Sequence, residues 1–308
     1  MMNPKVSIAA VQLPASFQPG QTNAEKREQN LCAAEVWLSC ASEQGADIAC
    51  IGETFNTLGL TLSAETLRAE IADASDEVTA RLGAVAKRCG IYIIAPVMAL
   101  RDNMPRNVAL VFGRDGNVIG EYCKVHCIEN ETQLGIVPGD QWPTFKLDFG
   151  TIGIQICHDN SFPESARCLT LNGAEIIFWP HVMSGWGGEF MDILLRSPAI
   201  HNGIYHVPVC FGCDPDRAWR PGMLIGRSSI IAPDATILAD AGRYPGIALT
   251  TIDLSRPRLA TTFTRDGDWV WRTDMRNDRR PETYAPLTRP HTPTPPEPAA
   301  SQKENRLS

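Results

Sequence analysis

The order of apolar and polar residues predicts alternating strands and helices from the first residues onward. VSIAAVQL, residues 6–13, is apolar enough for a buried strand, and residues 24–45 then carry apolar side chains at helical spacing until Gly45. DIACIGE, residues 47–53, is a second short apolar run. The chain therefore begins with a strand, a helix and a strand.

The same alternation continues to residue 254. It predicts a helix around 76–90, a strand at 91–100, a hairpin at 107–122 that turns at Asp115-Gly116, a hairpin at 142–157 that turns at Gly150, a helix at 164–174, a strand at 174–180, a helix at 188–203, a strand at 205–213, and final strands within 228–242 and 246–254. Helices that alternate with strands, together with repeated hairpins, indicate an α/β chain with a mixed sheet.

The last twenty residues differ from the rest of the chain. Residues 289–308 are rich in proline and polar residues and have almost nothing to bury, so we expect a disordered tail. The remaining residues, 1–288, show no internal repeat and no second core. We therefore expect a single domain, which a chain of 308 residues is long enough to form.

The net charge and the N-terminal sequence argue against some classes of binding partner. The formal net charge is -7 and basic residues are scattered, which argues against nucleic acid or an anionic membrane as partner. The N-terminal segment is too short and too polar for a secretion signal or a membrane span, so we expect a cytoplasmic protein. A small molecule is the expected partner.

Most of the ten cysteines lie in apolar segments, which predicts reduced, buried thiols rather than a disulfide framework. Cys210 and Cys213 form a C-x-x-C pair, a spacing found in redox pairs and zinc sites. A second pair with ligand spacing does not follow, and the first falls within a predicted strand. Buried structural thiols are therefore the favoured interpretation, and we expect no metal.

Cys157 stands apart because of its position. It ends an apolar strand and precedes a turn and a helix that Pro163 can start. This arrangement is that of a nucleophile elbow, in which neighbouring backbone N–H groups can hold an oxyanion. The alternative is one more buried thiol.

A nucleophilic cysteine needs a base. His158 is adjacent, but neighbouring residues on a strand point to opposite faces, so it is poorly placed to take the thiol proton. A protease-like Cys-His pair would need one of the distant histidines, namely His126, His181, His201 or His206. Glu53 and Lys124 each follow a predicted strand, where a carboxylate could act as base and an ammonium could face an oxyanion.

Five segments occur together in an order that resembles the nitrilase, or carbon-nitrogen hydrolase, superfamily: GET at 52–54, EYCKVH at 121–126, PGD at 138–140, FGTIGIQICHDNSFPESAR at 149–167 and GAEIIFWP at 173–180. The resemblance covers roughly residues 5–275. It implies a four-layer αββα sandwich that assembles as a homo-oligomer, a dimer or larger. It also implies a triad of Glu53 as general base, Lys124 as oxyanion stabiliser and Cys157 as nucleophile.

The resemblance further implies a second glutamate between the lysine and the Pro-Gly turn. Glu129 and Glu131 are both available, and Glu131 lies nearer the expected spacing from Pro138. The implied chemistry is acyl transfer to Cys157 followed by hydrolysis of the thioester, with the N–H of His158 as a second oxyanion donor. This chemistry needs no metal and no organic cofactor.

Substrate choice within this superfamily depends on loops. Cys157-His158-Asp159 resembles the amidase and N-carbamoyl hydrolase branches more than the Cys-Trp-Glu of nitrilases, so a nitrile is the alternative substrate. His158 replaces a frequent aromatic residue and is a candidate substrate contact. The loop HVMSGWGGEF adds His181, Met183 and Trp186 as candidate pocket residues. A catalytically silent protein that keeps the fold is the remaining alternative.

Overall fold

The structure, a computed structural model, describes residues 5–185, 188–216, 218, 220, 223–255, 260–263, 269–272 and 279–289. Backbone contacts divide the chain into two units, Met1–Asp274 and Met275–Ser308. In the second unit the described residues form two short 3-10 turns, Pro281–Thr283 and Ala285–Thr288. Apart from Arg289, the predicted tail lies outside the described residues, so its disorder stays a prediction.

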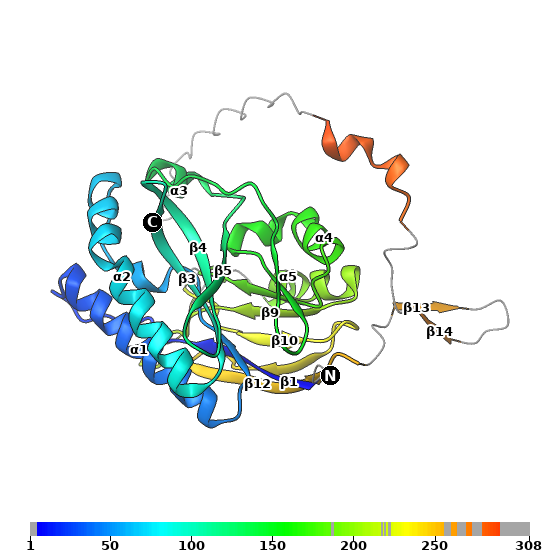
Figure 1. Cartoon of the computed structure of the whole chain (residues 1–308), viewed down its shortest axis with the longest axis horizontal. Helices are drawn as coiled ribbons and strands as arrows, with labels where there is room; N and C mark the ends of the chain where they lie inside the picture. The colour runs from blue at the N-terminus through cyan, green and yellow to red at the C-terminus, as the bar shows by residue number, and fades with distance from the viewer. Residues whose placement is uncertain are drawn as a thin grey trace, which may run out of the picture. The chain divides into compact units, whose positions relative to one another are not determined.

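The first unit contains two six-stranded mixed sheets (Figure 1). In the first sheet the order is β12-β1-β2-β3-β4-β5, with β1, β2 and β3 parallel and the outer pairs antiparallel. Its strands are β1 Lys5–Gln12, β2 Ile48–Cys50, β3 Tyr92–Arg101, β4 Met104–Phe112, β5 Val118–Cys123 and β12 Gly246–Asp253.

The second sheet repeats this plan, with the order β11-β10-β9-β8-β7-β6 and with β7, β8 and β9 parallel. Its strands are β6 Thr144–Lys146, β7 Thr151–Ile154, β8 Ile176–Pro180, β9 Tyr205–Val209, β10 Ser229–Ile231 and β11 Ile237–Asp240. The predicted turn at Gly150 joins β6 to β7, where Leu147 N donates to Gly150 O at 2.8 Å.

Helices cover the outer face of each sheet, as Figure 1 shows. Their bounds are α1 Asn23–Glu43 and α2 Ala64–Cys89 on the first sheet, and α4 Pro163–Leu171 and α5 Gly188–Asn202 on the second. Local sequence sets these bounds. Thr22 and Glu25 form a capping box at the start of α1, and Gly90, with φ 67°, ends α2 in the left-handed conformation.

The inner faces of the two sheets pack against each other. Ile8 and Ile94 from the first sheet share one buried cluster with Ile154, Phe178 and Val207 from the second. A separate cluster joins the outer face of the first sheet to α1 and α2. Helix, sheet, sheet and helix therefore form four layers, which confirms the predicted αββα sandwich.

The structure corrects several details of the prediction. Helix α2 begins at Ala64, well before the predicted residue 76, and the antiparallel pair β13 Ala260–Phe263 and β14 Trp269–Arg272 was not predicted. Strand β9 ends at Val209, so the C-x-x-C pair follows the strand instead of lying within it.

The cysteines are less buried than expected. All ten have free thiols, as predicted, but Cys50, Cys210 and Cys213 alone are buried, whereas six are half-buried and Cys32 is exposed. Within the described residues no set of three His, Cys, Asp or Glu side chains is placed to hold a metal ion. In the same residues no helix has the length and apolar character needed to cross a membrane.

Candidate active site

Three strand ends of the sandwich supply the charged and nucleophilic residues. Glu53 follows β2, Lys124 follows β5, and Cys157 follows β7 of the opposite sheet. The backbone of Lys124 is held on both sides, because its N–H donates to Asn107 O at 2.9 Å and its carbonyl accepts from Gly139 N at 2.8 Å. The predicted triad residues thus come from both sheets.

Lys124 lies between two carboxylates in the protein interior. Its Nζ is 2.9 Å from Glu53 Oε1 and 2.7 Å from Glu131 Oε2, and the Lys124 side chain is 1% exposed. Burial alone would lower the pKa of Lys124, but the negative charges of Glu53 and Glu131 oppose burial and raise the pKa above its ordinary value. The ammonium therefore stays charged across the neutral range.

Asn107 completes this cluster. Its Nδ2 donates to Glu53 Oε1 at 2.8 Å and to Glu131 Oε1 at 2.9 Å, and the residue is 1% exposed. One amide group thereby holds both carboxylates in place around the ammonium. Asn107 was not among the predicted site residues, although a polar residue at the start of an otherwise apolar strand segment, NVALVF, is a usable signal.

The structure distinguishes the two candidate second glutamates. Glu131 is buried in α3, Glu129–Gln133, and its Oε2 also accepts from Ile128 N at 2.9 Å. Glu129 is exposed and bonds Gln133 instead. Glu131 is therefore the residue that the structure brings to Lys124.

Cys157 has an unusual backbone. Its φ is 45°, in the left-handed region, and it begins a 3-10 segment that ends at Ser161. Its carbonyl accepts from Trp179 Nε1 at 2.8 Å. Cys157 therefore lies at a sharp turn after a strand, as predicted for a nucleophile elbow. However, Cys157 and His158 both belong to the 3-10 turn, whereas they were predicted to lie on a strand.

The Cys157 thiol lies against Glu53. Burial raises its pKa well above the ordinary value, and the charge of Glu53 raises it further, while Lys124 and the backbone N–H of Val182 lower it. Glu53 Oε2 has no hydrogen-bond partner among the described residues. The resting sulfur is thus a neutral thiol beside a buried carboxylate oxygen.

The other predicted site residues occupy varied positions. His158 turns toward the following residues, with Nδ1 3.2 Å from Ser161 Oγ and its ring edge on Phe162. His181 is completely buried and stacks on Trp179, with ring centroids 4.2 Å apart. Met183 is half-buried and packs against the cluster that contains Trp179. Trp186 lies outside the described residues.

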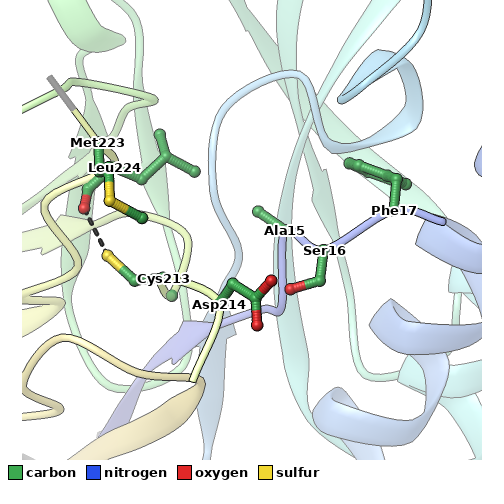
Figure 2. Close-up of a pocket in the computed structure, with 8 residues that line it drawn as sticks. Ala15, Ser16, Phe17, Cys213, Asp214, Met223 and Leu224 are labelled. Carbon is green, nitrogen blue, oxygen red and sulfur yellow. Dashed lines mark hydrogen bonds between the residues drawn. The ribbon is translucent and has the colours of Figure 1, made fainter. Parts of the chain in front are cut away.

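A mainly apolar cavity of about 270 Å³ lies beside the loop that follows β8. Figure 2 shows Ala15 and Phe17 on one side and Met223 and Leu224 on the other. The second side is attached to the loop, because Ser184 pairs with Leu224 and Gly185 N donates to Met223 O at 3.0 Å. Cys213 also lines the cavity, and its thiol donates a hydrogen bond to Leu224 O at 2.7 Å.

Known proteins resemble this chain over most of its length. The family described as carbon-nitrogen hydrolase matches residues 7–261. Deaminated glutathione amidase from a Synechocystis strain is 31% identical over 262 residues, 79% of this chain and 92% of that protein. Human omega-amidase NIT2 is 27% identical over 75% of this chain and 85% of its own. A nitrilase from Pyrococcus abyssi is 31% identical over 91% and 99%.

Solved structures show the same fold. An amidase from Nesterenkonia sp. superimposes with a TM-score of 0.73 at 22% identity, covering 92% of this chain and 96% of that one. Nit3 from Saccharomyces cerevisiae gives a TM-score of 0.68 at 22% identity, over 82% and 92%. At these identities the likeness establishes the sandwich and leaves the substrate open.

The buried ion cluster predicts a large loss of stability in Lys124→Met. Without the ammonium, Glu53 and Glu131 face each other in the interior, which we expect to cost about 3–5 kcal/mol of unfolding free energy near pH 7. Urea unfolding measures this loss, with Lys87→Met at an exposed site of α2 as control. A loss no larger than that of Lys87→Met would contradict the interpretation.

Two buried histidines predict sensitivity to acid. Burial lowers the pKa of His181 to about 3 and that of His206 to about 4. Because these values lie below the unfolded value near 6.5, the unfolded chain takes up protons first and stability falls as the pH drops. We expect the two histidines to remove about 3 kcal/mol of unfolding free energy between pH 7 and pH 5.

His181→Phe separates the contribution of one ring. The stacking on Trp179 can remain, and Nε2 has no hydrogen-bond partner among the described residues. The variant should lose about half as much stability as the parent over the same pH range. Urea unfolding at several pH values tests this, and an unchanged pH slope would show that His181 already titrates in the folded protein.

Proposed function

The chain belongs to the carbon-nitrogen hydrolase family and is an amidohydrolase, and on that premise we propose that it cleaves a linear amide or N-carbamoyl compound through a thioester on Cys157. The products are a carboxylic or carbamic acid and ammonia or an amine. Glu53, Lys124, Glu131 and Cys157 carry the chemistry in this proposal. Two relatives named as amidases support the substrate class.

The observation that carries the proposal is the neutral thiol of Cys157 beside the Glu53 carboxylate. A thiol whose pKa is raised by burial is a poor nucleophile until a base removes its proton. Glu53 supplies that base, and its other oxygen is fixed by Lys124 and Asn107. Lys124 is charged and close enough to both groups to stabilise an oxyanion that forms between them.

The proposed reaction has two halves. Glu53 takes the thiol proton while the sulfur bonds to the carbonyl carbon, and Lys124 with the His158 N–H holds the resulting oxyanion. The C–N bond then breaks as Glu53 passes the proton to the leaving nitrogen. In the second half Glu53 takes a proton from water, the hydroxyl attacks the thioester carbon, and the Cys157 thiol leaves with that proton.

We place the non-reacting part of the substrate in the cavity of Figure 2. Val182 contacts the Cys157 sulfur through its N–H, and Ser184, two residues further along, pairs with Leu224 in the cavity wall. Two residues of extended chain span roughly 7 Å. The loop that contacts the thiol is therefore joined to the cavity wall, and the mainly apolar lining favours an uncharged chain.

A nitrile substrate is the second candidate. The Pyrococcus abyssi relative, which is named a nitrilase, is 31% identical over 91% of this chain. Attack of Cys157 on a nitrile carbon would give a thioimidate, and two molecules of water would then release a carboxylic acid and ammonia. Glu53 and Lys124 would have the same roles in this reaction. Assays with both amides and nitriles are therefore needed to distinguish the two candidate functions.

Ammonia release from a panel of aliphatic and aromatic amides, N-carbamoyl amino acids and nitriles tests the proposed function. We expect the native protein to hydrolyse amides or carbamoyl compounds, and Cys157→Ala to lower the rate by roughly a thousandfold or more. Cys40→Ala, which removes a half-buried thiol from α1, is the control and should keep the native rate. Release from nitriles alone would favour the second candidate, and activity that survives in Cys157→Ala would contradict both.

The cavity predicts chain-length selectivity. Leu224→Phe adds volume to the wall and should lower kcat/KM roughly tenfold for the longest acyl chain accepted, with little change for the shortest. Leu238→Phe, at a 42% exposed position of β11, is the matched control and should leave this ratio unchanged. If Leu224→Phe affects all chain lengths equally, the acyl group lies elsewhere.

A further inference from the structure

We propose that Asp159 is a positioning residue that fixes the distance between Lys124 and Cys157 by linking the two sheets that carry them. The inference rests on the proposed function for the roles of those two residues. It adds a residue that touches neither the substrate nor the reacting atoms and acts through the hydrogen bonds of its carboxylate.

The Asp159 carboxylate is fully buried and accepts four hydrogen bonds. Oδ2 accepts from Tyr122 Oη at 2.6 Å and from Ile156 N at 2.8 Å. Oδ1 accepts from the backbone N and the ring Nδ1 of His126, each at 2.9 Å. Both oxygens are thus saturated by short, directed contacts.

These donors belong to the two segments that must meet. Tyr122 lies in β5 of the first sheet two residues before Lys124, and His126 lies two residues after Lys124. Ile156 directly precedes Cys157, which follows β7 of the second sheet. The carboxylate therefore holds the Tyr122 side chain before the lysine, the His126 backbone and ring after it, and the residue before the nucleophile.

A purely packing role would not need a charge. An ionised carboxylate removed from water is costly unless its hydrogen bonds replace hydration, and an apolar side chain could fill the same space. Burial, followed by the charge of Asp159, raises the pKa of Tyr122 well above its ordinary value, so its hydroxyl stays protonated and donates. The charged carboxylate adds directional hydrogen bonds between the segment around Lys124 and the segment around Cys157.

Direction matters here because the inner faces of the two sheets pack through apolar side chains. Ile154 and Phe178 of the second sheet meet the first sheet through non-directional contacts. Displacement of a catalytic group by about 1 Å can lower a rate roughly a hundredfold. Three of the four hydrogen bonds at Asp159 cross to the segment around Lys124, and they restrict such displacement where it would separate the ammonium from the sulfur.

Two variants test the link from opposite sides. Asp159→Asn keeps the shape but loses the charge, and Tyr122→Phe removes one donor from the lysine-bearing segment alone. Tyr92→Phe is the control, because Tyr92 packs on the same core cluster and contacts Phe149, away from the site. For each variant we would measure kcat and KM, the rate of Cys157 alkylation by iodoacetamide, and the urea midpoint.

For Asp159→Asn we expect kcat to fall roughly 10- to 100-fold with KM changed less than about threefold, and alkylation of Cys157 to slow. Alkylation slows because Lys124 favours ionisation of the thiol and moves away from it. Tyr122→Phe should change both rates in the same direction by a smaller factor. The double variant should be little slower than Asp159→Asn, since both changes break one link.

Native kcat and native alkylation rate in a folded Tyr122→Phe and a folded Asp159→Asn would overturn the proposal. So would rate losses that match Tyr92→Phe at equal urea midpoints. If Asp159→Asn does not fold, Tyr122→Phe decides alone. Alkylation needs no substrate, so it tests the link even if Cys157→Ala shows that the proposed hydrolysis is wrong.

Discussion

A lysine ammonium enclosed between two carboxylates is the interaction on which the rest of the structure around the site depends. Lys124 is 1% exposed, and an ammonium that leaves water survives only where opposite charges replace its hydration. Glu53 and Glu131 provide those charges from different segments of the chain. The ends of β2 and β5 and the helix α3 must therefore converge, and Asn107 fixes the geometry at the point of convergence.

The convergence also explains a glycine in the PGD segment. A Cβ at Gly139 would lie 2.4 Å from the carbonyl oxygen of Cys123, so any larger residue would push away the strand end that carries Lys124. Gly139 N also donates to the carbonyl of Lys124 at 2.8 Å. Close approach of the two backbones, and not flexibility, is what this position requires.

Local patterns predicted most of the helices and strands, whereas the four-layer sandwich and the roles of Glu53, Lys124 and Cys157 were implied by the resemblance to the carbon-nitrogen hydrolase superfamily. Strand β1, helix α1 and the turn at Gly150 follow from periodicity and from residues that cap or bend the backbone. The start of α2 was placed too late because its amphipathic pattern is weak before residue 76. The pair β13 and β14 was missed because its short strands lie beyond the last clear apolar run.

Within the site, local sequence patterns did not predict the residues whose contacts lie far away in the sequence. Cys157 sits in a local motif that the sequence displays. Asn107, Trp179 and Asp159 act by contacting segments that are distant in sequence, so the functions of their hydrogen bonds appear only when the sheets are assembled. The choice of Glu131 over Glu129 was correct in geometry, although spacing alone was its basis.

Because the lysine and the cysteine belong to different sheets, the spacing between the sheets is itself a chemical variable. Ile154 and Phe178 help to set that spacing, whereas Leu38 packs from α1 onto the outer face of the first sheet and does not. A related enzyme adapted to a higher or lower working temperature should therefore carry most of its core substitutions in the outer layers. Substitutions in the inner layer are limited both by the packing of the two sheets and by their effect on the catalytic rate.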